Sequence, residues 1–121
     1  EGLAKLYGIL SSGGSRNNKK IISPETLEII TTQISNGPDT VLMGGDVAFG
    51  LGYMLYNKTA RVEESPKHTK GYFGHAGIGG AVAYGDKGKN LGFAFVCNKE
   101  HKIQELYKTS NQISEALHSI I

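Results

Sequence analysis

The sequence predicts an α+β fold, in which a small antiparallel sheet of about three to four strands is covered on one face by N- and C-terminal helices. Three observations predict it. Apolar residues recur every three or four positions near both ends of the chain, as on one face of a helix. Between these ends they alternate with other residues, as in half-buried strands, and glycine-rich turns separate the alternating runs. At 121 residues, the chain has the length of one domain with a two-layer core.

Three helices are expected, at about residues 2–12, 24–34 and 101–120. Ser23 suits the N-cap of the second helix, and Pro24 suits its first helical position. The apolar stripes of the first two helices consist of Leu3, Leu6, Tyr7 and Leu10, and of Leu27, Ile30 and Ile34. The stripe of the last helix comprises Ile103, Leu106, Tyr107, Ile113, Leu117, Ile120 and Ile121. Each helix therefore has one face that needs a partner surface.

Four strands are expected, at about residues 48–56, 71–76, 79–85 and 90–97. In the first, Phe49, Leu51, Tyr53 and Leu55 share one side. The last two strands form an antiparallel hairpin, because the intervening Gly-Asp-Lys-Gly-Lys-Asn has the composition of a turn. Residues 11–20 and 57–70 are polar and are expected to be loops.

Composition excludes several classes of function. A formal net charge of +2 without a basic run argues against nucleic acid as a partner, and no apolar run has the length of a membrane span. Cys97 is the sole cysteine, which rules out an internal disulfide; it fits a soluble protein in a reducing, intracellular compartment and is expected to be a small core residue. The four histidines are far apart in the sequence, so we expect neither a metal nor another cofactor.

The segment 73–80, Phe-Gly-His-Ala-Gly-Ile-Gly-Gly, is the most unusual in the chain. Glycine weakens a strand, so a stretch with four glycines either turns sharply or lets another group approach its backbone. Two interpretations of His75 are open at this stage. In the first, it is a histidine at a sheet edge with no chemical role. In the second, it belongs to a site in which an exposed backbone N–H faces a developing oxyanion.

The order of these segments resembles the final third of the serine β-lactamase, penicillin-binding-protein and esterase superfamily. The similar segments are 49–56, 72–80 and 81–100, followed by the C-terminal helix, and upstream 4–14 and 21–32. The closest pattern is the class C-like branch of β-lactamase-domain hydrolases and esterases. The resemblance implies that residues 1–121 are the C-terminal segment of a β-lactamase-like α/β domain, whose main partner is the missing N-terminal part of the same protein.

Three motifs converge on one cleft in that superfamily: S-x-x-K, Y-x-N or Y-x-S, and K-T-G or its variant H-x-G. Only the third is present in this chain, at residues 75–77. The resemblance implies a supporting catalytic role for His75, which would bind a substrate carboxylate or the tyrosine oxygen. It also implies that Ile78 supplies one backbone N–H of the oxyanion hole. The substrate-binding positions that it implies are Ala76, Gly77, Gly79 and Gly80.

No serine here is followed three residues later by lysine, and no tyrosine begins Y-x-N or Y-x-S. The nucleophile and the general base are thus absent, and the segment alone is expected to be inactive. The resemblance implies a parent esterase or amidase that acts on a small ester or amide through an acyl-enzyme. A non-catalytic module that uses the same fold for binding or assembly is the alternative.

The chain begins with Glu1, so we expect it to be a processed product or part of a longer protein. Loss of the early strands of the family's sheet would leave an edge with unpaired N–H and C=O groups. The isolated segment is therefore expected to self-associate.

Overall fold

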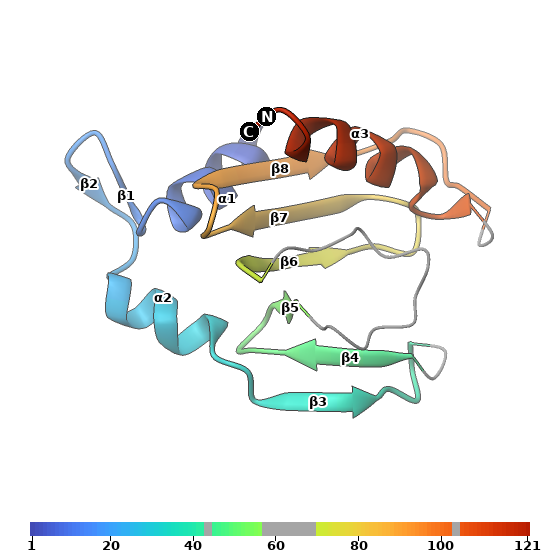
Figure 1. Ribbon diagram of the computed structural model, residues 1–121, viewed down its shortest axis with the longest axis horizontal. Helices are drawn as coiled ribbons and strands as arrows, with labels where there is room; N and C mark the ends of the chain where they lie inside the picture. Colours follow the sequence, from blue (N-terminus) through green and yellow to red (C-terminus); the bar gives the residue numbers. More distant parts are fainter. Residues whose placement is uncertain (43–44, 57–69, 103–104) are drawn as a thin grey trace.

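The computed structural model describes residues 1–42, 45–56, 70–102 and 105–121. Three helices surround one large sheet, and a small hairpin projects beyond it (Figure 1). The helices are α1 (Gly2–Ser11), α2 (Pro24–Thr31) and α3 (Lys108–His118). The hairpin strands are β1 (Ser15–Arg16) and β2 (Lys19–Lys20). The large sheet contains β3 (Ser35–Pro38), β4 (Asp46–Phe49), β5 (Met54–Leu55), β6 (Tyr72–Ala76), β7 (Val82–Asp86) and β8 (Leu91–Phe95).

The large sheet is antiparallel and its strand order follows the chain, β3-β4-β5-β6-β7-β8. This confirms the predicted α+β class and the β7–β8 hairpin, but the sheet has six strands instead of three or four. The segment expected as one strand at 48–56 forms β4 and β5, with a turn between them. Gly52 has a φ of +88° in that turn, and a Cβ on Gly50 would lie 2.5 Å from the Ile30 carbonyl oxygen.

Strand β3 was not predicted, because Asn-Gly-Pro normally ends regular structure. It lies at the edge of the sheet, where a proline is tolerated. The predicted loop 11–20 contains the β1–β2 hairpin, and Asn17 and Asn18 turn it with φ values of 50° and 60°. Asparagine adopts this left-handed conformation more readily than most residues.

Three other boundaries differ from the sequence-based ones. Helix α2 ends at Thr31 instead of about residue 34, and strand β7 begins at Val82 instead of residue 79. Helix α3 begins at Lys108, whereas the apolar spacing predicted a start near residue 101. The predicted stripe residue 103 lies outside the described residues.

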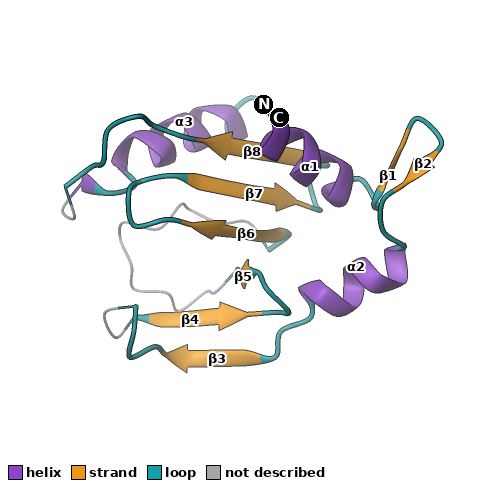
Figure 2. Ribbon diagram, turned by 180° about the vertical axis from the view of Figure 1, so that it is seen from behind, coloured by secondary structure: helices purple, strands orange, loops and turns teal. Residues whose placement is uncertain are grey.

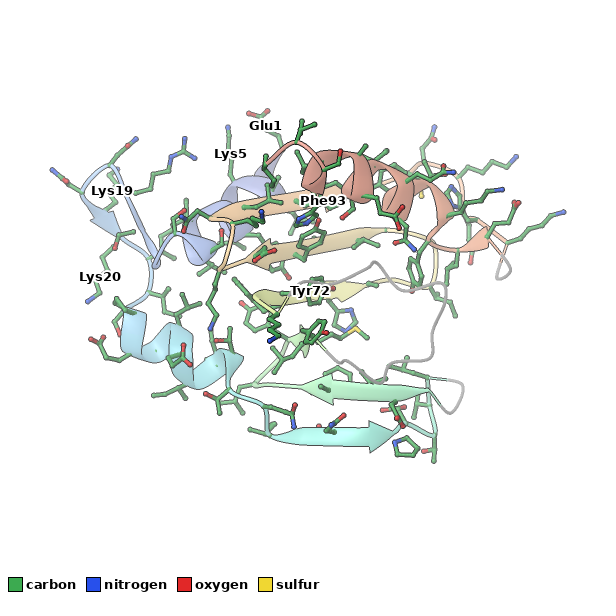
Figure 3. All side chains as sticks on the ribbon, viewed as in Figure 1. Glu1, Lys5, Lys19, Lys20, Tyr72 and Phe93 are labelled. Atoms are coloured by element: carbon green, nitrogen blue, oxygen red, sulfur yellow. The ribbon has the colours of Figure 1, made fainter. Side chains whose placement is uncertain are left out.

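The helices cover both faces of the sheet, which corrects the expectation of a single covered face. On one face, Phe73 packs with Tyr7 and Leu10 of α1 and Leu27 of α2. On the other face, the core residues are Tyr72, Val82, Tyr84 and Phe93, and Leu117 of α3 packs against them. Figures 1 and 2, which view the sheet from opposite sides, show α3 in front of the sheet in one view and α1 in front in the other. Tyr72 and Phe93 are labelled on the α3 side in Figure 3.

Helix α1 lies very close to β8 because glycines meet at the contact. A Cβ on Gly92 would overlap the Gly8 backbone and the Ala4 carbonyl oxygen. On the neighbouring strand, a Cβ on Gly85 would lie 2.5 Å from the ring of Phe73. Glycines in β7 and β8 thus form a flat surface on which α1 and Phe73 pack.

A buried polar network attaches α3 to its face of the sheet. The Tyr84 hydroxyl lies 2.5 Å from Ser114 Oγ and 3.0 Å from His118 Nε2. Burial raises the pKa of Tyr84 above its ordinary value, so this hydroxyl stays neutral at physiological pH. The ring of Tyr84 also stacks on Phe93 of β8. The network therefore combines hydrogen bonds with apolar packing.

The α1–β8 contact predicts that Gly92→Ala destabilises the fold. The added methyl group has to displace α1, which costs about 1–3 kcal/mol by the usual scale for overpacking. Urea unfolding followed by circular dichroism measures the loss. Gly2→Ala is the matched control, since a Cβ there meets no atom within 4 Å. Equal stability of the Gly92→Ala protein and the wild type would contradict the close contact.

The α3 network predicts non-additive effects of two substitutions. Tyr84→Phe leaves the buried Ser114 hydroxyl without this partner, at a cost of roughly 1–3 kcal/mol. Ser114→Ala removes the same interaction from the other side, so the double variant loses less stability than the sum of the single variants. Unfolding free energies of the four proteins test this. Strict additivity would show that the two hydroxyls do not interact.

Candidate functional site

Strand β6 carries the first predicted site residue, His75, out of the buried part of the sheet. Tyr72, Phe73 and Gly74 are buried, whereas His75 is exposed. Strand β5 pairs only with Phe73 and Gly74, so the chain from His75 onward extends beyond the end of β5. The imidazole therefore lies at the surface and not inside the core.

The backbone at Ala76 faces away from β7. The N–H of Gly77 donates to the Ala81 carbonyl oxygen at 2.7 Å, so 77 and 81 oppose each other as a hydrogen-bonded pair. Hydrogen-bonded and non-hydrogen-bonded pairs alternate along an antiparallel ladder. The next pair, Ala76 with Val82, is therefore a non-hydrogen-bonded one. The N–H and the C=O of Ala76 consequently point toward the β5 side of the sheet, beyond Met54, the first residue of β5.

His75 uses one of these groups to orient its ring. Its Nδ1 lies 2.9 Å from the Ala76 carbonyl oxygen. Since a carbonyl oxygen only accepts hydrogen bonds, this contact places the proton on Nδ1. In the neutral ring, Nε2 then carries a lone pair; in the protonated ring, Nε2 is a second donor.

A tight turn follows directly at residues 77–80. The N–H of Gly80 donates to the Gly77 carbonyl oxygen at 2.9 Å, and Gly80 has a φ of +93°. Ile78, at the tip, is 67% exposed. In the part of the chain that the structure describes, its N–H donates no backbone hydrogen bond. This N–H is available to an acceptor outside the turn.

The structure brings all six predicted site residues together at the end of one hairpin, and it separates the roles of the glycines. Gly80 is needed for the turn itself, because a side chain there would be strained and would meet the Leu106 carbonyl oxygen at 2.6 Å. Gly77 and Gly79 have no such steric requirement, since a Cβ on either would make only ordinary contacts at 3.8 Å or more. Their effect is to leave the backbone of the turn uncovered.

Sequence reasoning missed the support that this turn receives from the segment after β8. The Cys97 thiol lies 3.4 Å from the Gly79 carbonyl oxygen, and the N–H of His101 donates to the same oxygen at 3.4 Å. Cys97 is half-buried, and its role as a hydrogen-bond donor differs from the expected purely apolar one. No local pattern signals such a contact, because 18 residues separate Cys97 from Gly79.

His75 and Ile78 are both exposed, so this end of the hairpin lies open at the surface. Two shallow hollows of the described surface lie elsewhere. One is beside α2, with Thr31 and Lys87 in its lining, and the other is beside the start of α3, with His101 and Lys108.

In residues 1–42, 45–56, 70–102 and 105–121, no three His, Cys, Asp or Glu side chains gather in a way that could hold a metal ion. None of the described helices combines the length and the apolar character needed to cross a membrane.

Comparisons with known proteins place this chain in a family. The model of the Beta-lactamase family matches residues 1–118. A penicillin-binding protein homolog from Caulobacter crescentus has a similar structure with a TM-score of 0.70 and 32% identity, over 81% of this chain and 25% of that chain. No curated protein matches the sequence.

Two further solved structures are also similar. A family VIII carboxylesterase gives a TM-score of 0.73 with 25% identity, over 89% of this chain and 31% of that chain. The fold is also shared by EstA from Arthrobacter nitroguajacolicus Rue61a, with a TM-score of 0.63 and 18% identity. This match covers 96% of this chain and 32% of that chain. The chain thus spans about a quarter to a third of the length of these relatives. From the fold, the hairpin and the match over residues 1–118, we conclude that this chain belongs to the β-lactamase family.

Proposed function

We propose that residues 75–80 form the H-x-G wall of an acyl-transfer site in a β-lactamase-like serine hydrolase, which acts on a small ester or amide. One observation supports the proposal above all. The exposed imidazole of His75 and the N–H of Ile78, which makes no backbone hydrogen bond within the described residues, belong to the same hairpin end. A titratable ring beside a backbone donor suits a reaction in which charge develops on a carbonyl oxygen.

The role of each group follows from its chemistry. A serine from the remaining part of the protein would attack the substrate carbonyl, and the negative charge would move to the carbonyl oxygen. The Ile78 N–H would donate to that oxyanion, together with the N–H of the serine. His75 Nε2, with its ring fixed by Nδ1, would bind a substrate carboxylate or the oxygen of the catalytic tyrosine.

The nucleophile and the general base have to come from outside these 121 residues, because neither of their motifs occurs in the sequence. The similar solved chains are three to four times as long as the matched region, which leaves room for both. The missing N-terminal part of the same protein is therefore the proposed partner. It would complete the cleft opposite β6 and the turn.

His75→Ala in the full-length protein is expected to lower esterase activity by about 10²-fold or more, the usual scale for loss of a group that stabilises developing charge. Folding should be nearly unchanged, since the side chain is exposed. Hydrolysis of p-nitrophenyl esters measures the change. His75→Lys is the matched control, because the family uses lysine or histidine at this position, and it should retain more activity than His75→Ala.

Two results would contradict this proposal in different ways. Equal activity of the wild type and His75→Ala would reduce His75 to a structural residue. If the full-length protein shows neither ester turnover nor labelling by a fluorophosphonate, the non-catalytic module for binding or assembly becomes the better description.

The isolated chain is expected to self-associate through β8. This strand ends the sheet, contains no charged residue or proline, and has no partner on its outer side among the described strands. Sedimentation velocity at tens of micromolar should show species larger than a monomer. Val96→Lys places a charge directly after β8, at a position that is 68% exposed, and should reduce the association. Val41→Lys is the control, because Val41 is 86% exposed and lies between β3 and β4, so this variant should associate like the wild type. A monomeric wild type would refute the expectation.

A further inference from the structure

We infer that Cys97 is a positioning residue for the turn at residues 77–80, and that its thiol helps to hold the Ile78 N–H in its orientation. The catalytic consequence of this inference rests on the proposed function, whereas the positioning itself does not. Cys97 follows β8 and belongs to the connection that leads to α3. It is thus far from the turn in sequence but in contact with it in space.

The contact is a hydrogen bond to the second half of the turn. Cys97 Sγ lies 3.4 Å from the Gly79 carbonyl oxygen, which is within the range for a sulfur donor. A thiol donates weakly, and a carbonyl oxygen has two lone pairs. The second lone pair is used as well, because the N–H of His101 donates to the same oxygen at 3.4 Å. One peptide group of the turn is therefore held by two donors from the same connection.

The turn is also held by packing. A Cβ on Gly80 would lie 2.6 Å from the Leu106 carbonyl oxygen and 3.2 Å from His101 Nδ1. The backbone of Gly80 therefore rests directly on His101 and Leu106, with no room for a side chain between them. The other end of the turn is attached to β7 through Gly77 and Ala81, at 2.7 Å. With both ends held, the central residues Ile78 and Gly79 have less freedom to rotate their peptide groups.

This restraint matters for an oxyanion donor. Such a donor lowers the barrier only if it already points at the position of the developing charge, so that no reorganisation is needed during the reaction. A turn with a glycine on each side of Ile78 has little stiffness of its own. Contacts with Cys97, His101 and Leu106, which follow β8, restrain the turn instead. Cys97 makes its contact through the side-chain thiol.

Hydrogen exchange of the full-length protein tests the positioning directly. Cys97→Ala removes the donor, so a peptide covering residues 76–82 should exchange roughly two- to fivefold faster, the scale for loss of one weak hydrogen bond. Cys97→Ser keeps a donor at the same place and should restore part of the protection. Ser119→Ala is the control, because it removes a hydroxyl-to-carbonyl hydrogen bond at the far end of α3 and should leave residues 76–82 unchanged.

Steady-state kinetics test the consequence. In Cys97→Ala, kcat should fall roughly two- to fivefold with KM unchanged, because the donor acts on the transition state and not on the bound substrate. Unchanged exchange in Cys97→Ala would overturn the positioning role whatever the activity. If exchange changes and serine rescues it, but the wild-type protein hydrolyses no ester, the positioning role stands and the proposed function fails.

Discussion

The burial of β6 between two helical layers is the constraint on which the rest of the structure depends. Two adjacent residues of this strand anchor opposite faces: Phe73 is 0% exposed under α1 and α2, and Tyr72 is 4% exposed on the α3 side. Burial of one large apolar side chain contributes on the order of 1.5–3 kcal/mol, so the two together fix the strand firmly. The chain leaves the covered region only two residues later, at His75. The imidazole is thus exposed because the buried part of β6 ends at Gly74.

The sequence predicted this central part well because its signals are local. Alternating apolar residues define β7 and β8, and the polar turn between them fixes their pairing, so the antiparallel hairpin followed directly. The glycine-rich stretch after His75 also stood out, but the strand expected from residue 79 begins only at Val82, because residues 77–80 form a turn. By contrast, Ser35–Pro38 has a composition that normally ends secondary structure, and it forms a strand only because β4 is there to pair with it. Tertiary pairing overrides local preference at such an edge.

Two further features could not be predicted, for a common physical reason. The stripe on a helix shows which side of the helix is buried, but it does not show which face of the sheet receives it, so the placement of α1 and α3 on opposite faces required the structure. The contact of Cys97 with Gly79 is equally non-local. The interpretation of residues 75–77 as a third motif came from the resemblance to known hydrolases and stays a prediction. The substrate does not follow from membership of the β-lactamase family, because one fold hosts many activities.

The placement of α3 has a consequence for how the protein is made. All six strands of the large sheet precede this helix in the chain, yet Tyr72, Tyr84 and Phe93 depend on it for their cover. When the strands from Ser35 to Phe95 have been synthesised and α3 has not, the sheet therefore has one aromatic face open to water. Until α3 emerges from the ribosome, that nascent chain presents an apolar surface of the kind that chaperones recognise.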